Sequence, residues 1–181
     1  MKEAFLNNEI WVLTFGAAFQ RANIYNENAL SEQKGHFKTM TRALIEEVVL
    51  NNYKTGSVSD EQHIENIKRI SEYSANFSEL FVNGKINFGI AQKMLNLYLK
   101  YQWSLGNMQE PPHFPVDRII QEKLNKEARQ AGLNTISIEP WTQYPDEKHY
   151  LAVIALARQV IANSYTKYCL AELELELFNR R

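Results

Sequence analysis

The chain has 181 residues, a length that fits one compact domain rather than two. Apolar residues make up 45% of it and charged residues 23%, which excludes a disordered chain and indicates a folded globular protein. Twenty basic and 21 acidic residues leave a net charge of −1, so the molecule as a whole has no electrostatic attraction for nucleic acid. The chain contains only seven Gly and five Pro, and this scarcity of turn residues favours an all-α fold.

Cysteine content and hydropathy limit where the protein works. Cys169 is the only cysteine, which excludes a disulfide within the chain and a Cys-rich metal site, and suggests a reducing compartment. The N-terminus meets acidic and amide residues before any apolar run long enough for a signal peptide. No apolar stretch reaches the ~18 residues of a membrane helix. We therefore expect a cytoplasmic protein without a membrane partner.

Apolar periodicity predicts about six helices in a single domain that spans residues 1–181. The first extends from about Glu3 to Ile24, with a break near Gly16, and a polar connector follows. The second extends from about Gly35 to Tyr53, where a turn-forming segment ends it.

The third and fourth helices are joined by a short turn. Ser59 and Gln62 have the spacing of a capping box, so the third helix begins there and continues to about Leu80. Asn83-Gly84 is typical of a tight turn. The fourth helix, Gly89 to Leu105, is apolar on most sides, and its polar residues fall on one narrow edge: Gln92, Lys93, Asn96 and Lys100.

The sequence of the C-terminal third predicts two further helices, followed by a tail rich in Glu and Leu. Pro115 suits the first turn of a helix that extends to about Ala131 and has Asp117 near its start. Residues 132–141 alternate in polarity, but a single strand cannot pair alone, so we expect a loop. The final helix begins at Pro145 and continues past Tyr168. The Glu-Leu tail is expected to be helical, with an exposed Leu175 as a candidate homodimer contact.

The sequence lacks the motifs of several common enzyme classes. The sequence contains no Walker-type phosphate loop, dinucleotide fingerprint, zinc-protease helix or nucleophile elbow. The four histidines are far apart in sequence and lack metal-ligand spacing, so we predict no metal site and no cofactor; His113, which precedes Asp117, is the strongest functional candidate among them.

A candidate site is formed by two segments, residues 88–96 and residues 114–118. A glycine at a turn into a helix, Gly89, exposes backbone N–H groups that can bind a phosphate, and Lys93 lies one turn further on. Asp117 can approach Lys93 if the two helices pack as a pair. A lysine and a carboxylate beside a phosphate suit amine attack on a sugar carbon, in which the carboxylate stabilises positive charge.

These two segments resemble the helix-hairpin-helix DNA glycosylases, especially the 8-oxoguanine branch, in which the hairpin reads Gly-Val-Gly-x-Lys and a later segment reads Pro-Val-Asp. The resemblance covers Phe88 to Ile119. It implies a helix-hairpin-helix element, a double-stranded DNA partner, a flipped damaged base, Lys93 as the Schiff-base nucleophile and Asp117 as the catalytic aspartate. The DNA-binding residues would be Gly89, Ala91, Gln92, Asn96, Lys100 and Arg118.

The sequence departs from that pattern and also permits another interpretation. Ala91 replaces the second hairpin glycine, Phe88 replaces the usual proline, and the 24-residue spacing between Lys93 and Asp117 is long for the family. In the alternative, Lys93 lies on a solvated helix edge and Asp117 only stabilises a helix start. The chain would then be a non-enzymatic helical protein that binds a protein partner or itself.

Overall fold

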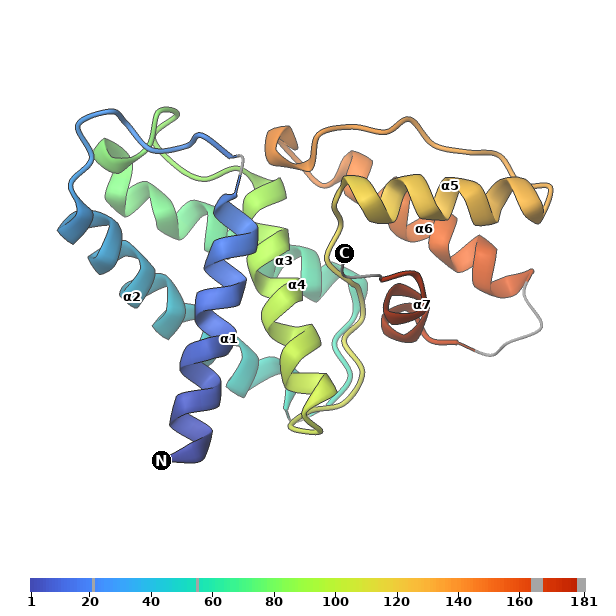
Figure 1. The fold of residues 1–181 in the computed structure, drawn as a ribbon, viewed down its shortest axis with the longest axis horizontal. Helices are drawn as coiled ribbons and strands as arrows, with labels where there is room; N and C mark the ends of the chain where they lie inside the picture. Colours follow the sequence, from blue (N-terminus) through green and yellow to red (C-terminus); the bar gives the residue numbers. More distant parts are fainter. Residues whose placement is uncertain (21, 55, 164–167, 179–181) are drawn as a thin grey trace.

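The described residues form an all-α fold without a β-sheet, and α4 lies at its centre (Figure 1). The computed structural model describes residues 1–20, 22–54, 56–163 and 168–178. Within these ranges there are seven α-helices: α1 (Lys2–Phe19), α2 (Ser31–Val48), α3 (Asp60–Tyr73), α4 (Phe88–Ser104), α5 (Arg118–Gln130), α6 (Lys148–Ala162) and α7 (Leu170–Leu177). A π-helical turn, Val49–Tyr53, extends α2, and two 3-10 segments cover Ser74–Leu80 and Trp141–Gln143.

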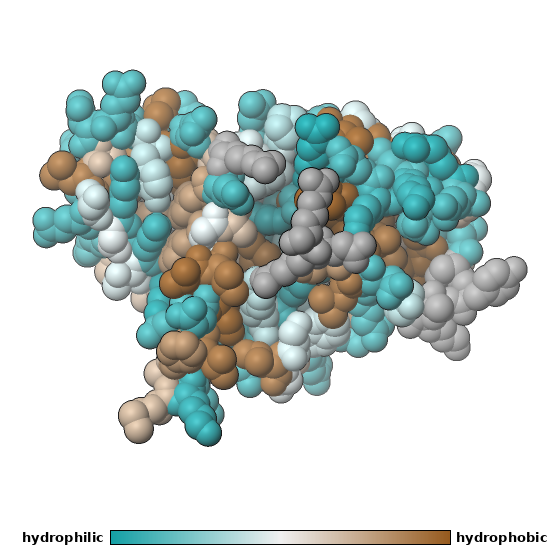
Figure 2. All heavy atoms as spheres, viewed as in Figure 1, coloured by the Kyte–Doolittle hydropathy of each residue, from teal (hydrophilic) through white to brown (hydrophobic). Residues whose placement is uncertain are grey.

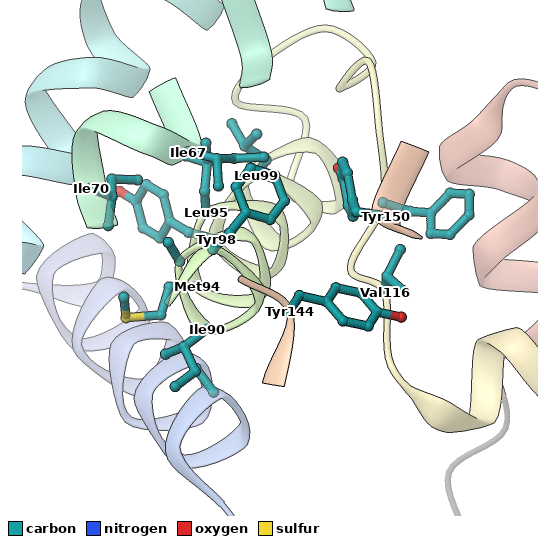
Figure 3. Packing of buried hydrophobic residues seen from close by; sticks show 14 of the residues in the cluster. Ile67, Ile70, Ile90, Met94, Leu95, Tyr98, Leu99, Val116, Tyr144 and Tyr150 are labelled. Carbon is teal, nitrogen blue, oxygen red and sulfur yellow. The ribbon is translucent and has the colours of Figure 1, made fainter. Parts of the chain in front are cut away.

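The buried side chains of α4 join two groups of helices. On one side α4 packs against α1 and α3, and the Trp11 and Tyr98 rings stack with their centroids 4.5 Å apart. On the other side lie α5, α6 and α7, with α5 beside α6 (Figure 1). Figure 3 shows Ile90, Met94 and Leu95 of α4 inside the core. Because α4 contacts both groups, it is buried on almost all sides, as its sequence predicts.

The extended segments are held by buried amide side chains instead of a β-sheet. The Gln121 side chain accepts a hydrogen bond from the backbone of Glu139 and donates one back to it, both at 3.0 Å. Asn125 forms the same pair of bonds with Ile136. These four hydrogen bonds satisfy backbone N–H and C=O groups that, in a β-sheet, would bond to a neighbouring strand. The expected loop over residues 132–141 is confirmed, and these bonds explain why it holds a fixed path.

Several predicted boundaries are wrong. The first helix ends at Phe19 instead of Ile24, and it passes through Gly16 without a break. Pro115 lies outside α5, because Asp117 is extended and caps that helix. The last predicted helix is two helices: α6 ends at Ala162, and α7 begins after Cys169, whose Sγ accepts the Glu172 N–H. Residues 164–167, which the single helix was expected to include, lie outside the described residues.

Among the described residues, none of the helices has the length and apolar character to cross a membrane.

Candidate functional site

Lys93 and Asp117 form an ion pair between α4 and the start of α5. The Lys93 Nζ lies 2.8 Å from the Asp117 Oδ2. The Lys93 side chain is 8% exposed and the Asp117 side chain 30% exposed, so solvent reaches the pair from the Asp117 side. Burial opposes ionisation of Asp117, but the Lys93 ammonium and backbone N–H donors of α5 outweigh it and lower the pKa of Asp117. The carboxylate is therefore negative at neutral pH.

Asp117 is positioned by its own helix and by Gln92. The Asp117 Oδ1 accepts the Ile120 N–H at 3.0 Å, so the residue is the N-cap of α5. Gln92, on α4, donates to the Val116 carbonyl at 2.8 Å and accepts the Val116 N–H at 3.1 Å. These two bonds fix the residue before Asp117 against the helix that carries Lys93. The ion pair is therefore held from both sides.

The turn of residues 141–144 covers the start of α4. The Gly89 N–H donates to the Tyr144 carbonyl at 3.3 Å, and Asn87 donates to the Thr142 carbonyl at 2.6 Å. A Cβ on Gly89 would stand 1.7 Å from the Trp141 carbonyl oxygen, so only glycine allows this contact. The same turn places the Trp141 ring centroid 5.6 Å from the Lys93 Nζ.

The backbone N–H groups at the start of α4 were expected to bind a phosphate, but they form hydrogen bonds within the protein. The Gly89 N–H is bonded to Tyr144, the Ile90 N–H to the Asn87 side chain, and the Ala91 N–H to the Asn87 carbonyl. These three donors are therefore already used within the protein. The helix-hairpin-helix element that the resemblance implies is not confirmed, since α4 follows a 3-10 segment and an extended connection.

Most of the expected DNA-binding residues lie in the interior. Ala91, Gln92 and Asn96 have no exposed surface, and Gly89 is buried under the turn of residues 141–144. Only Arg118 is exposed, and it pairs with Glu122 at 2.7 Å. The polar edge of α4 is thus not solvated. Gln92 and Asn96 form hydrogen bonds inside the protein instead, to the Val116 backbone and to the Tyr150 hydroxyl.

Lys100 forms a second buried pair, two turns along α4 from Lys93. Its Nζ lies 2.6 Å from the Glu174 Oε2 of α7, with the two side chains 11% and 6% exposed. The Lys100 Nζ also stands 3.9 Å from the Phe178 ring centroid. Burial raises the pKa of Glu174, although Lys100 acts in the opposite direction. The Lys100 side chain therefore attaches α7 to α4.

Two histidines that are distant in sequence meet beside the site in a buried network. The His63 and His113 ring centroids are 4.7 Å apart, and the His113 Nδ1 lies 3.0 Å from the Tyr150 hydroxyl. Asn96 of α4 donates to the same hydroxyl at 3.0 Å. His113 also contacts Asp60 at 3.1 Å. Burial lowers the pKa of His113 to about 4 and that of His63 well below its usual value. Both rings are thus neutral at pH 7.

No pattern in the sequence identifies Tyr144, Glu174 or Tyr150 as a site residue. Tyr144 is 2% exposed, and its hydroxyl has no hydrogen-bond partner among the described residues. Aromatic and acidic residues of this kind occur throughout helical proteins, so no motif separates them from core or surface positions. Their importance depends on tertiary contacts with residues far away in the chain.

A separate hollow lies beside the turn of residues 141–144, and Thr142 and Gln143 of that turn form part of its lining. Its volume is about 760 Å³, and it is lined by charged residues that include Glu65, Lys68, Glu72, Lys85, Asp146 and Glu147. Lys68 pairs with Glu147 at 2.8 Å, and Lys85 pairs with Glu72 at 2.5 Å. Asp146 in turn lies 3.5 Å from the Lys148 Nζ, so most of these lining charges are paired.

Comparisons with protein-family models, with curated proteins and with solved structures found no match to this chain.

Proposed function

We propose that the protein binds damaged double-stranded DNA and that Lys93 attacks an electrophilic sugar carbon there, as in the DNA glycosylases that residues 88–119 resemble. The observation that carries this proposal is the 2.8 Å contact between Lys93 and Asp117. A buried lysine and a partly exposed carboxylate, brought together from positions 24 residues apart, are the two groups that such an attack requires. The single cysteine fits a reducing, cytoplasmic location for this work.

An abasic site offers a defined reaction for these groups. Its sugar opens to an aldehyde, and the Lys93 amine, after losing one proton to solvent, adds to the aldehyde carbon. The resulting carbinolamine loses water and becomes an imine. Asp117 would stabilise the cationic form of that imine, because it already pairs with the cationic lysine. Arg118, exposed beside Asp117, would contact the DNA backbone.

Borohydride trapping on duplex DNA that contains an abasic site tests the proposal. Borohydride reduces the imine to a stable amine, so a covalent protein–DNA adduct records the attack. We expect an adduct with the native chain and none with Lys93→Ala. Lys126→Ala removes an exposed lysine of α5 and serves as the matched control. Equal trapping by native chain and Lys93→Ala would contradict the proposal, because free surface amines also react with abasic sites.

A second candidate function, binding of a protein partner or of a second copy, is favoured by the outer face of α1. Phe5, Leu6, Val12 and Leu13 are 63%, 46%, 66% and 43% exposed. Figure 2 shows apolar residues gathered along α1. Exposed apolar groups of this kind are typical of interaction surfaces. Leu175 of α7 is also exposed, as expected. Light scattering after size-exclusion chromatography tests self-association, and Phe5→Ser should reduce any dimer that forms through α1.

A further inference from the structure

The C-terminal helix α7 covers Lys100, the second lysine on the edge of α4 that carries Lys93. The Lys100 Nζ lies 2.6 Å from the Glu174 Oε2 and 3.9 Å from the Phe178 ring centroid. Within the part of the chain that the structure describes, the contacts of this ammonium thus come from α7 and from the residue that follows it. The helix packs against α5 and α6, on the side of the molecule away from α2 (Figure 1). Detachment of α7 would therefore expose the Lys100 ammonium.

Lys93 and Lys100 have the spacing to contact one strand of DNA. They lie two turns apart on α4, so their side chains leave the same face of the helix, ~10 Å apart along its axis. Each nucleotide of a strand advances ~3.4 Å along a duplex, so a strand whose reacting sugar is at Lys93 has a phosphate near Lys100, within about three nucleotides. A lysine ammonium binds phosphate by the same charge-assisted hydrogen bonds as carboxylate. The Glu174 carboxylate thus occupies the place where this phosphate would bind.

The charged pair is not needed to attach α7. Removing a carboxylate and an ammonium from water costs free energy that their attraction only offsets, so an apolar pair of similar size is often at least as stable. Leu170 and Leu173 of α7 already belong to the hydrophobic core, and an apolar side chain at position 174 would extend this contact. A buried carboxylate on a buried lysine therefore indicates a contact that another anion can replace.

The attachment of α7 is weak enough for such an exchange. The helix has eight residues, fewer than the ~12–15 that an isolated helix needs. Its N-cap is the Cys169 thiol, a weak acceptor, whose Sγ lies 3.4 Å from the Glu172 nitrogen. Besides Glu174, only three of its side chains are buried, those of Leu170, Ala171 and Leu173. A short helix with few buried apolar contacts opens more readily than the core helices do.

We propose that α7 is an autoinhibitory cover, in which the Glu174 carboxylate holds Lys100 until a phosphate of the DNA backbone displaces it. This inference rests on the DNA partner of the function proposed above. In the closed form Lys100 has no contact with DNA. When α7 detaches, the Lys100 ammonium binds a phosphate and holds the strand along the edge of α4 that leads to Lys93. The apparent affinity for DNA is reduced by the fraction of molecules that are open.

Two variants with opposite expected effects test the cover. Glu174→Gln removes the charge that holds Lys100, so we expect trapping at limiting abasic DNA to be about 10-fold faster, although the melting temperature falls. The double variant Lys100→Met, Glu174→Leu attaches α7 by an apolar contact and lacks the phosphate ligand. It should trap about 10-fold more slowly than the native chain at a melting temperature close to the native one.

Glu176→Gln is the matched control, because it loses the same charge at an exposed position of α7 and should trap at the native rate. A helix with a structural role only predicts a different pattern. In that case Glu174→Gln traps at the native rate or more slowly, and the double variant traps at the native rate. Either of these results would overturn the inference.

Hydrogen exchange separates this inference from the role of Lys93. Exchange of the α7 backbone amides is measured by mass spectrometry in the free chain and on abasic duplex DNA, where we expect it to be faster. Unchanged exchange on bound DNA would overturn the cover, even if Lys93-dependent adducts form. Faster exchange on DNA and tighter binding by Glu174→Gln, without a Lys93-dependent adduct, would overturn the nucleophile and support the cover. A native chain and a Glu174→Gln variant that both fail to bind the duplex would overturn both.

Discussion

At the scale of single residues, Asp117 stabilises the fold in two ways that can be measured separately. Its carboxylate caps α5, and it also neutralises a buried lysine. Asparagine can still accept the Ile120 N–H but leaves Lys93 without a partner. We expect Asp117→Asn to lower the free energy of unfolding by roughly 2 kcal/mol, less than for a fully buried pair because Asp117 is partly exposed.

Asp117→Ala removes the cap as well, and should cost ~1 kcal/mol more. Urea unfolding of both variants measures the two contributions. Equal losses in the two variants would show that the cap adds nothing.

The pairing of Lys93 with Asp117 could be anticipated from the sequence, whereas its burial could not. The Gly-x-x-x-Lys and Pro-Val-Asp segments indicated that a lysine and a carboxylate could meet. The sequence also suggested that the Lys93 edge of α4 faces solvent, and this is wrong. α7 and the turn of residues 141–144 cover that edge, and both come from positions more than 45 residues away. Contacts between such distant segments leave no periodic pattern in α4 itself.

At the scale of elements, the start of α4 depends on one glycine. A Cβ at Gly89 would meet the Trp141 carbonyl at 1.7 Å, so Gly89→Ala must displace the turn of residues 141–144. We expect a loss of more than ~2 kcal/mol in the free energy of unfolding, in the range of overpacked buried positions. Thermal unfolding measured by circular dichroism gives the comparison.

Gly16→Ala in α1 is the matched control. Nothing lies within 4 Å of a Cβ at Gly16, which is also helical. There the substitution should raise stability by ~0.5–1 kcal/mol, through the higher helix propensity of alanine. A similar stabilisation at both positions would contradict the close packing of Gly89.

Element types were easier to predict than element ends. Ser59 caps α3 as expected, with its Oγ accepting the Gln62 N–H, because a cap is a local signal. The separation of α6 from α7 was missed, since apolar residues continue at helical spacing through this region. Pro115 was assigned to the first turn of α5 because proline is common there. Gln92 instead bonds to the backbone of Val116 and holds the chain extended until Asp117.

At the scale of the whole molecule, Lys100 and Glu174 connect α7 to the central helix. Glu174→Gln leaves the Lys100 charge buried without a counterion, so we expect a loss of ~3 kcal/mol or more. The double variant Lys100→Met, Glu174→Leu removes both charges and should recover most of this loss. Urea unfolding of Lys100→Met, of Glu174→Leu and of the double variant gives the coupling energy. A double variant as unstable as the sum of the singles would contradict the pairing.

The buried histidines couple the stability of the whole molecule to pH. An unfolded histidine binds its proton near pH 6.5, but His113 in the fold does so only at about pH 4. Between these values the unfolded chain binds more protons, so the free energy of unfolding decreases as pH falls from 7 to 4, by ~3 kcal/mol for His113. His63, whose pKa is also lowered by burial, adds to the decrease.

Urea unfolding across this pH range measures the effect. His113→Asn should flatten the dependence, whereas His36→Asn, at an exposed position of α2, should retain it. An unchanged slope in His113→Asn would show that another group is responsible.

The central claim, that Lys93 is the nucleophile, is tested most directly by locating the trapped lysine. The native chain is reduced with borohydride on abasic duplex DNA, digested, and analysed by tandem mass spectrometry. The account predicts that the sugar remnant is attached to Lys93. Attachment distributed over exposed lysines such as Lys126 and the N-terminal amine, with Lys93 unmodified, would contradict it.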